Sequence, residues 1–227
     1  LTAIGNAIVD ILAPCTPEFL AGQAANGMNI NSMNLIDATR VESLYKLMGP
    51  TTEMSGGSAG NTMAAFTSLG GKGAYIGKVA NDQFGKIFTH DMHAMGIHFQ
   101  TPPLQNSIST AQCLILVTPD AVRTMNTYLG ACVCLDEDDI NEHVVGGSAI
   151  TYLEGYLFDP PAAKRAFFKA AEIVQQYGRQ LSLTLSDAFC VNRHRDDFIK
   201  LVNNHVDILF ANETELMAYT GMKHIEE

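Results

Sequence analysis

The sequence predicts an α/β fold in which a parallel sheet is flanked by helices and carries a small β-rich lid. From residue 149 onward, short apolar strands alternate with amphipathic helices, the order that builds parallel sheets with right-handed crossovers. Near 11–36 and 97–135 this rhythm is interrupted by polar, Gly/Asn-rich residues and by alternating β-branched residues. We expect these two segments to form a lid that stands off one edge of the core.

Helices and strands are expected at defined places in the first hundred residues. Gly49-Pro50, Gly70-Gly71 and Gly96 mark helix ends, because glycine and proline close helices. The last of these helices is capped by Asn81-Asp82 and has apolar residues at helical spacing. The expected helices cover 37–48, the residues after 61 up to 69, and 81–96, and the expected strands cover 3–4, 9–12 and 74–79.

Strands and helices alternate regularly in the C-terminal part of the chain. Residues 161–177 place Phe167, Ala170 and Val174 on one helical face, and Gly178 ends that helix. The expected strands are 150–153, 181–185 and 206–211, and the other expected helices are 196–203 and 213–220. This order favours parallel strands joined by helical crossovers.

Composition and charge exclude several classes of function. Hydrophobic residues make up 47% of the chain, as in globular proteins, and the net charge of −10 argues against a nucleic acid held by phosphate contacts. The longest apolar run, Cys113–Val117, is far shorter than a membrane span, and no basic-then-apolar leader opens the sequence. We therefore expect neither a nucleic-acid partner nor a membrane partner.

The cysteines and histidines do not follow the spacing of a metal site. Cys132 and Cys134 alternate along an expected strand, unlike the C-x-x-C spacing of zinc sites. His90 and His93 lie one helical turn apart without a third ligand nearby, which indicates a solvated helix face. The odd number of scattered cysteines indicates reduced thiols in a cytoplasmic protein.

The stretch SGGSAGN, Ser55–Asn61, contains three glycines and precedes an expected helix. Glycines at a helix N-terminus let a ligand approach free N–H groups, and the amide of Asn61 can both donate and accept hydrogen bonds. These features suit an anion or a polyhydroxylated ligand. A tight strand-to-helix turn that needs glycine for packing explains the same spacing.

Two other glycine patterns fail as phosphate-binding motifs. Gly71–Gly77 is one residue too long for a dinucleotide fingerprint, and it runs from a helix into a strand, the reverse of the required order. Gly73–Val79 is one residue short of a P-loop, and Val79 stands where a serine or threonine would bind magnesium. Neither stretch is expected to hold phosphate.

Several stretches occur along the chain in an order typical of one kinase family. The specific ones are a first signature, formed by Gly56–Asn61, Leu69–Gly71, Gly77–Val79 and Asp82–Gly85, and the N-x-x-E element Asn212–Glu215. The supporting ones are Ile4–Asp10, Arg123–Ala131, Tyr152–Tyr156 and Leu185–Phe189. Together they resemble the ribokinase/PfkB family of carbohydrate and nucleoside kinases, and within it the adenosine kinase branch. The resemblance covers about 3–221 and implies a ribokinase-like fold.

The resemblance implies a binding site for the phosphate acceptor. In it Asp10, Gly57 and Asn61 would hold ribose hydroxyls, with Asn6 and Gly56 beside them. A carboxylate and an amide in a fixed fork can satisfy vicinal hydroxyls, and such a site rejects analogues that lack them. From the residues alone, Asp10 could instead cap a turn at a strand end, and Asn6 could be an ordinary turn residue.

The resemblance also implies apolar walls for a nucleobase at Met125 and Phe189, with Tyr156 as a further candidate. A methionine and an aromatic ring are suitable contacts for a flat purine. Considered singly, each of these side chains is at least as common in a hydrophobic core as in a ligand wall.

Phosphate and metal roles fall on three residues. In the family the asparagine of the N-x-x-E element, here Asn212, acts at the phosphates of ATP, and the glutamate, here Glu215, organises Mg²⁺ through water. Arg123 would neutralise charge on the transferred phosphate. The alternatives are an N-cap at Asn212, a favourable charge in the first helical turn at Glu215, and a surface arginine beside a turn.

One part of the family pattern does not occur in the sequence. The second signature, D-T-x-G-A-G-D, supplies the anion-hole glycines and the catalytic aspartate, and no G-A-G run is present before Glu227. We therefore expect a single ribokinase-like domain over 1–227 that lacks its C-terminal part and holds no catalytic aspartate of its own.

Three functions are compatible with these features. The first is most of a kinase that transfers the γ-phosphoryl group of ATP, with Mg²⁺, to the 5′-hydroxyl of a nucleoside, adenosine first, while the lid excludes water. The second is a sugar kinase acting on ribose or a related carbohydrate. The third is a truncated, inactive product that binds a nucleoside. A β-rich lid can also serve as a homodimer surface.

Overall fold

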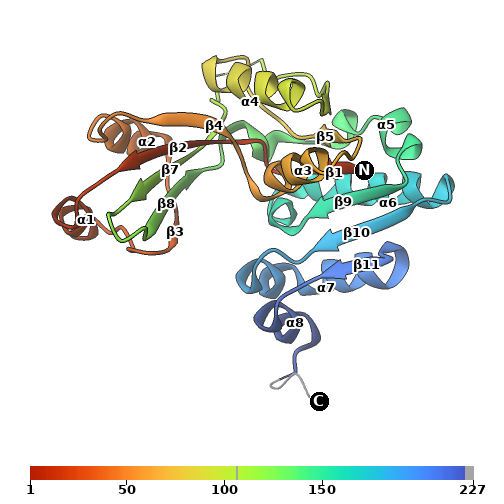
Figure 1. Cartoon of the computed structure of the whole chain (residues 1–227). Coiled ribbons are helices and arrows are strands. Elements are labelled where there is room, and N and C mark those ends of the chain that lie inside the picture. The colour runs from red at the N-terminus through yellow and green to blue at the C-terminus, as the bar shows by residue number, and fades with distance from the viewer. Residues whose placement is uncertain (106, 223–227) are drawn as a thin grey trace.

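The computed structural model describes residues 1–105 and 107–222. Their strands form two sheets, one of six strands and one of five, which lie side by side in Figure 1. These are called the large sheet and the small sheet below. The chain passes repeatedly between them, so neither sheet is built from one continuous segment.

The large sheet is entirely parallel, as the sequence predicts. Its strand order is β11-β10-β9-β1-β5-β6, and every neighbouring pair in it runs parallel. The strands are β1 (Thr2–Ile4), β5 (Ala74–Ile76), β6 (His98–Phe99), β9 (Ile150–Glu154), β10 (Gln180–Thr184) and β11 (Ile208–Phe210). The carboxyl ends of these strands therefore meet at one edge, which is called the carboxyl edge below.

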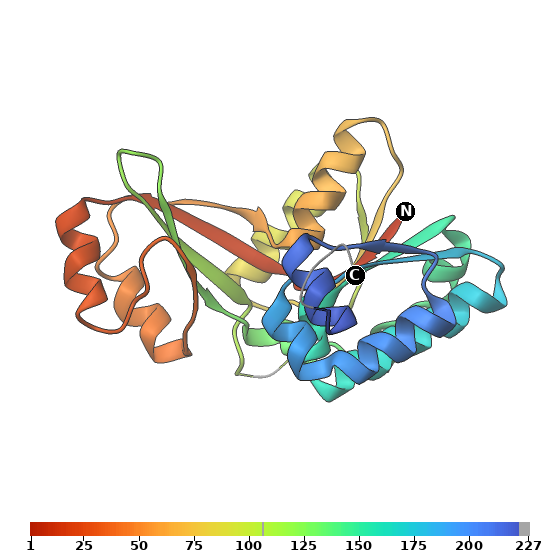
Figure 2. The ribbon, with the colours of Figure 1, turned by 90° about the horizontal axis from the view of Figure 1, so that it is seen from below.

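Helices lie on both faces of the large sheet, as the view from below in Figure 2 shows. One face carries α3 (Ser58–Ser68) and α4 (Gln83–Ala94), and the opposite face carries α5 (Glu142–Gly147), α6 (Pro161–Gln176) and α7 (Ala188–His205). The last helix, α8 (Glu213–Thr220), packs against α7 and ends at Gly221 in the left-handed conformation. The prediction of a parallel-sheet core flanked by helices is confirmed.

Side-chain alternation along the strands explains why both faces are covered. In β1, Ala3 packs into the cluster under α3 and α4, whereas Ile4 packs into the cluster with α6 and α7. Because successive residues of a strand point to opposite faces, a strand with two apolar faces is stable only between two layers of helices. The phenyl rings of Phe158 and Phe198 stack at 4.1 Å in the second of these clusters.

The small sheet mixes parallel and antiparallel pairs in the order β3-β8-β7-β2-β4. Its strands are β2 (Ile8–Pro14), β3 (Met33–Leu35), β4 (Thr52–Gly56), β7 (Ala111–Val117) and β8 (Arg123–Tyr128). Val9 and Ile11 face a core shared with Leu20 of α1 (Pro17–Ala24) and Leu44 of α2 (Ala38–Tyr45). The alternate residues of β2, which include Asp10, point to the other face.

The small sheet differs from the expected lid segments 11–36 and 97–135 in three places. β4 belongs to it although it lies outside both segments, and β6 lies inside the second segment but pairs in the large sheet. The first segment contains α1 rather than only loop and short strands. Thr16 caps this helix by accepting a hydrogen bond from the N–H of Phe19, and Pro17 occupies its first position.

Other elements also differ from the sequence-based prediction. The expected strand through Cys132 and Cys134 is wrong, because Gly130–Cys134 forms a 3₁₀ helix in which Cys132 is buried. The short helix expected over 196–203 is part of the longer α7, which has a kink at His194. No helix was expected at α5, where Asn141 accepts a hydrogen bond from the N–H of Val144 as its N-cap.

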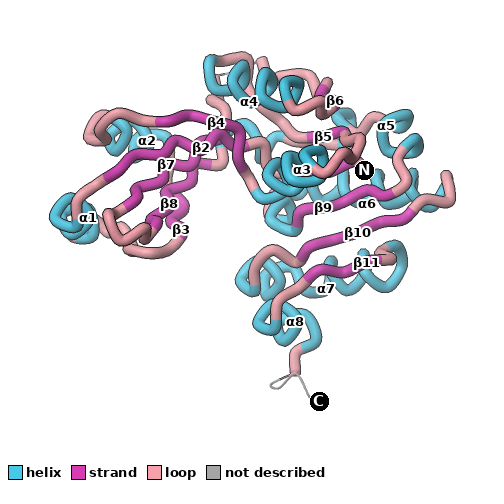
Figure 3. The backbone as a smooth tube through the Cα atoms, in the orientation of Figure 1, coloured by secondary structure: helices cyan, strands magenta, loops and turns pink. Residues whose placement is uncertain are grey.

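Within the described residues, one face of β10 and β11 has no helical cover. In Figure 3 no helix crosses the near side of these two strands. An apolar hollow of about 380 Å³ lies there, and its lining includes Ile150, Tyr152, Ile208 and the exposed Phe210.

Within the residues that the structure describes, no helix is long and apolar enough to cross a membrane.

Candidate functional site

The carboxyl edge of the large sheet carries four of the predicted site residues, each after a different strand. Asn6 follows β1, Tyr156 follows β9, Phe189 follows β10 and Asn212 follows β11. At the same edge the chain crosses from β1 into β2 of the small sheet, which brings Asp10 toward this group. Open α/β sheets bind ligands at the carboxyl ends of their strands, so this edge is the candidate site.

Asp10 lies in β2 next to Gly56, the last residue of β4. The register pairs Asp10 with Met54 and Ile8 with Gly56. A Cβ atom at Gly56 would overlap the carboxyl group of Asp10, so any other residue at this position would displace that group. Burial raises the pKa of Asp10 to about 6, and no hydrogen bond from the described residues offsets this desolvation. A ligand hydroxyl would supply the missing donor.

Gly57 joins β4 to α3 in a conformation that favours glycine. Its φ of 80° and ψ of 150° lie outside the regions that L-residues readily adopt. A Cβ atom there would lie 2.6 Å from the carbonyl oxygen of Asn6. Gly56 and Gly57 therefore serve close backbone approach in a tight strand-to-helix turn.

Glu154, which was not predicted as a site residue, connects these parts. It ends β9, it is 1% exposed, and its carboxylate accepts hydrogen bonds from the N–H of Asn6 at 2.6 Å and the N–H of Ala59 at 3.1 Å. The hydroxyl of Ser58 donates a further hydrogen bond to it. Burial raises the pKa of Glu154, while the donors from Asn6, Ser58 and Ala59 oppose this rise. Its sequence signals are its place directly after the expected strand 150–153 and within the family-like stretch Tyr152–Tyr156.

The glycine-rich stretch is also held from α4. The N–H of Ser55 donates to the carboxylate of Asp91 at 2.8 Å. Asn61 makes the first backbone hydrogen bond of α3, from its N–H to the carbonyl of Gly57 at 2.9 Å, and its exposed side chain makes none with the described residues. The amide of Asn61 is therefore free to meet a ligand.

Met125 shares a face of the small sheet with Asp10. Leu12 pairs with Ile115, and Ile115 pairs with Met125, two residues along the strands from the row that contains Asp10. Residues two apart on a strand point to the same side, so this face combines one carboxylate with apolar side chains. Met54, opposite Asp10, is 44% exposed on it. Neither Leu12 nor Met54 was predicted, because only the register of β2, β4 and β7 brings them here.

Arg123 lies farther from the other site residues. It begins β8 opposite Val117, which in turn pairs with Pro14, so it is four residues beyond the row of Asp10, or about 13 Å along the strands. The residue is exposed and faces the same side as Asp10. Arg123 thus lies beside the turn after β7, as expected if it is a surface arginine.

Tyr156 and Phe189 differ in their surroundings. Burial, and then the negative charges of Asp187, Glu154 and Glu215, raise the pKa of Tyr156 to about 12. Phe189 lies in the first turn of α7 and is 77% exposed. It is therefore not a core residue, whereas Tyr156 lies partly exposed between acidic groups.

Asn212 and Glu215 bind each other. The N–H and the side-chain amide of Asn212 donate to the two carboxylate oxygens of Glu215 at 3.1 and 2.8 Å, and the N–H of Glu215 donates back to Asn212 at 2.9 Å. This reciprocal capping box opens α8. Among the described residues, no group of three or more His, Cys, Asp or Glu side chains could hold a metal ion.

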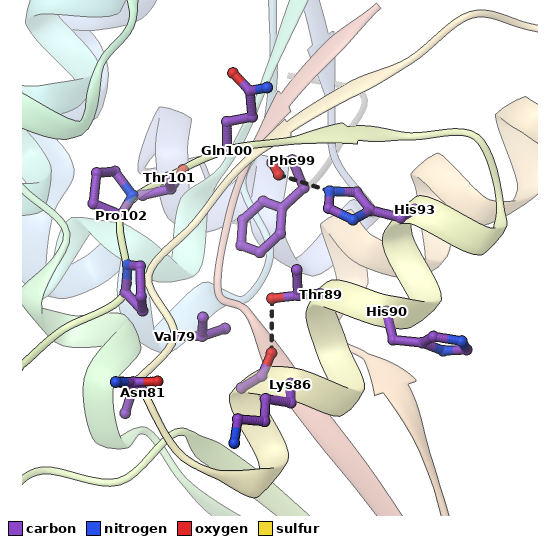
Figure 4. A pocket seen from close by; sticks show the side chains of 13 residues that line it. Val79, Asn81, Lys86, Thr89, His90, His93, Phe99, Gln100, Thr101 and Pro102 are labelled. Carbon is purple, nitrogen blue, oxygen red and sulfur yellow. Dashed lines mark hydrogen bonds between the residues drawn. The ribbon is translucent and has the colours of Figure 1, made fainter.

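A hollow of about 460 Å³ lies apart from this site, between α4 and residues 99–103 (Figure 4). Two of its polar side chains have protein partners: Thr89 donates to the carbonyl of Gly85 at 2.7 Å, and the ring of His93 donates to the carbonyl of Phe99 at 2.9 Å. In Figure 4, His90 points away from the hollow. None of the predicted site residues lines it.

Comparison with known proteins places the chain among kinases. The model of the pfkB family carbohydrate kinase matches residues 30–227. A solved adenosine kinase from Sinorhizobium meliloti is 53% identical, with a TM-score of 0.89, over 99% of this chain and 68% of that one. A probable sugar kinase protein from Rhizobium etli is 50% identical, with a TM-score of 0.88, over the same shares of the two chains.

Similarity to a curated protein is lower but covers nearly the whole chain. The adenosine kinase of Saccharomyces cerevisiae is 25% identical over 229 aligned residues, which include 96% of this chain and 65% of the yeast protein. The chain thus spans slightly less than two thirds of that relative.

Proposed function

The chain belongs to the pfkB family of carbohydrate kinases, and we propose that it forms the acceptor-binding part of a kinase that phosphorylates the 5′-hydroxyl of a nucleoside, adenosine first. The observation that carries this proposal is the desolvated carboxylate of Asp10, which lies beside Gly56 and receives no hydrogen bond from the residues that the structure describes. The relatives named adenosine kinase point in the same direction.

Ribose recognition is proposed for four residues, Asp10, Asn61, Gly57 and Asn6. The carboxylate of Asp10 would accept from two vicinal hydroxyls, and the amide of Asn61 would bind the same pair from the side of α3. Gly57 and Asn6 keep the backbone close enough for the sugar to reach both groups. A site built in this way rejects a sugar without those hydroxyls, because its polar groups would then be buried without partners.

Base recognition distinguishes a nucleoside from a free sugar. The apolar side chains of Leu12, Met54 and Met125 share the face of Asp10, and Phe189 stands exposed at the carboxyl edge. A purine between these surfaces would cover apolar area that ribose alone leaves in water. We propose Met125 and Phe189 as its main contacts, with Tyr156 near the rim. This apolar surface favours the nucleoside over the alternative of ribose or a related carbohydrate.

ATP and Mg²⁺ enter the proposal through family membership. The described residues do not by themselves fit a magnesium ion, since both carboxylate oxygens of Glu215 are engaged by Asn212. They likewise include no complete phosphate cradle. We therefore keep Asn212 at the phosphates, Glu215 near the metal and Arg123 near the transferred phosphate as proposals, and we derive no chemical step through them.

The small sheet is proposed to act as the lid of the site and as a homodimer surface. Its edge strand β3 exposes Met33 and Leu35, which a second copy could cover. Closure over the nucleoside would exclude water from the reacting hydroxyl. The five free thiols are compatible with a cytoplasmic protein.

A titration and a transfer assay on the full-length protein test the proposal. Calorimetry with adenosine, inosine, ribose and fructose gives the acceptor class, and release of ADP from Mg·ATP gives turnover. Adenosine binding with turnover supports the nucleoside kinase, and preference for ribose supports the sugar kinase. Adenosine binding without turnover at high protein concentration supports the inactive nucleoside-binding product, and binding of none of the four overturns the proposal.

A further inference from the structure

We propose that Glu154 is a positioning residue that holds the two halves of the nucleoside site at a fixed spacing without touching the nucleoside. The inference rests on the proposed function, because it concerns the same site. Its basis is geometric: one buried carboxylate receives backbone N–H groups from the end of β1 and from the start of α3.

The two anchors of Glu154 belong to segments that are far apart in sequence. Asn6 leads from β1 of the large sheet into β2, which carries Asp10, and Ala59 lies in the first turn of α3, which carries Asn61. No covalent link shorter than about fifty residues joins these segments. They are also paired directly through Ile8 of β2 and Gly56 of β4. Glu154 comes from a third element, β9, and links the two segments at a second point.

The carboxylate takes the place of a missing helix cap. Gly57 is the N-cap residue of α3, and it has no side chain with which to bind the first N–H groups of the helix. Glu154 accepts from the N–H of Ala59 and from the hydroxyl of Ser58. This negative charge also lies at the positive end of the helix dipole, where it is stabilised. Gly57 can thus serve the ligand while another strand caps the helix.

Tight packing around the carboxylate makes its position unique. A Cβ atom at Gly5 would lie 2.5 Å from the Cβ of Ala59 and 3.0 Å from the carboxylate of Glu154, so β1 and α3 are already in close contact there. Glu154 is 1% exposed, so its oxygen atoms are turned to the protein rather than to a ligand. A shift of either anchor would therefore move Asp10 relative to Asn61.

The variant Glu154→Gln tests this role in the full-length protein. Glutamine keeps the size of the side chain, but its NH₂ group cannot accept from an N–H, so at least one anchor loses its acceptor. We expect the dissociation constant for adenosine to rise about 10- to 100-fold, as small displacements of site residues do. The milder variant Ser58→Ala keeps both anchors, and we expect a change of at most about threefold.

Deoxynucleosides separate positioning from direct contact. Substitution of a residue that binds one hydroxyl does not change the affinity for an analogue that lacks that hydroxyl. Substitution of a positioning residue lowers the affinity for all analogues by the same factor. We therefore expect Glu154→Gln to lower the affinities for adenosine, 2′-deoxyadenosine and 3′-deoxyadenosine by the same factor. A loss confined to nucleosides that carry one particular hydroxyl would show that Glu154 is a ligand and would overturn the proposal.

Asp207→Asn is the matched control for stability. The carboxylate of Asp207 accepts from the N–H of Leu181 at 2.8 Å, at the opposite edge of the same sheet. Both variants should lower the melting temperature, but only Glu154→Gln should change the affinity of the folded protein. Equal affinities for adenosine in wild type and Glu154→Gln would leave Glu154 a merely structural role.

Hydrogen exchange gives a readout that does not depend on the nucleoside. In Glu154→Gln the amides of Asn6 and Ala59 should exchange faster, while those of α6 keep the wild-type rate. If wild type binds no nucleoside, the proposed function fails, and the inference fails with it as a statement about binding. Faster exchange would then show only that the link between the anchors exists, and unchanged exchange would refute that link as well.

Discussion

Two regions of the carboxyl edge, both assigned to the site by sequence, differ in how completely they are built. Around β1 and α3, Asn6, Gly57 and Glu154 lock the backbone through buried contacts, and the carboxylate of Asp10 is left without a donor. Around β10 and β11, Asn212 and Glu215 satisfy each other, and Phe189 and Phe210 stand 77% and 53% exposed.

The difference separates a preorganised half of the site from a half whose polar groups are already satisfied. Binding to the first half costs little ordering, because the backbone there is fixed before the ligand arrives. In the second half a ligand must displace existing hydrogen bonds or cover exposed aromatic rings. Substitutions near Asp10 should therefore affect binding more than substitutions near Phe189.

The largest effect is expected for Asp10→Asn. This change keeps the shape of the side chain but removes the charge that would accept from two hydroxyls, so adenosine affinity should fall by about 100-fold. Calorimetric titration of adenosine measures it, and circular dichroism checks the fold. The loss should be smaller for 3′-deoxyadenosine, because that analogue lacks one of the two hydroxyls that Asp10 would bind. Wild-type affinity for adenosine would remove Asp10 from the site.

Gly57→Ala should have the next largest effect. Its φ of 80° and the 2.6 Å contact with the carbonyl of Asn6 force the backbone to move, which should cost about 1–3 kcal/mol of stability and about tenfold in adenosine affinity. Thermal unfolding and titration measure the two effects. The control is Gly22→Ala in the middle of α1, where a Cβ meets nothing within 4 Å, and there we expect a small gain in stability.

The fold could be predicted where its signal is local. Alternation of strands with helices after residue 149 predicted the parallel sheet. The N-cap residue Asn212 and the stop at Gly221 predicted both ends of α8 correctly. What failed depends on partners distant in sequence. β4 is recognisable only when β2 lies beside it, and Cys132 and Cys134 follow a strand-like pattern although Gly130–Cys134 turns as a 3₁₀ helix.

The site shows the same limit. Asp10, Gly57 and Asn61 lie in short motifs, and the resemblance to the kinase family nominates them as ligand contacts. Glu154 lies in the supporting stretch Tyr152–Tyr156, but its contacts with Asn6 and Ala59 arise only because β9 brings it next to them. Family motifs therefore nominate residues for ligand contact, whereas only tertiary structure shows what holds those residues in place.

Titration of Asp10 should make adenosine binding depend on pH. Its pKa of about 6 means that the free protein gains a proton there as pH falls, whereas ribose hydroxyls need the ionised carboxylate as acceptor. Affinity should therefore rise with pH through about 6 and be about tenfold lower at pH 5 than at pH 7. The pKa of Cys113, which pairs with Asp10, is raised to about 11, so this thiol stays neutral throughout.

Stability of the free protein should change in the opposite direction. The raised pKa of Asp10 favours its protonated form in the folded state, so the contribution of Asp10 is present below pH 4 and is lost as pH rises through about 6. In Asp10→Asn this part of the pH dependence should vanish from melting temperatures recorded between pH 4 and 8. An affinity profile in wild type that stays flat over this range would contradict the assignment of Asp10 as acceptor.

The smallest effect is expected from Phe189→Ala, in the half of the site around β10 and β11. Because Phe189 is 77% exposed, its loss should change stability by less than about 0.5 kcal/mol. If its ring lines the base, adenosine affinity should fall about fivefold, the size of one aromatic contact, while ribose affinity stays unchanged. Phe210→Ala is the matched control, since it removes another exposed ring that packs edge-on against Tyr152. A fall of similar size in both variants would mean that the two rings act through the exposed face of the large sheet and not through the base.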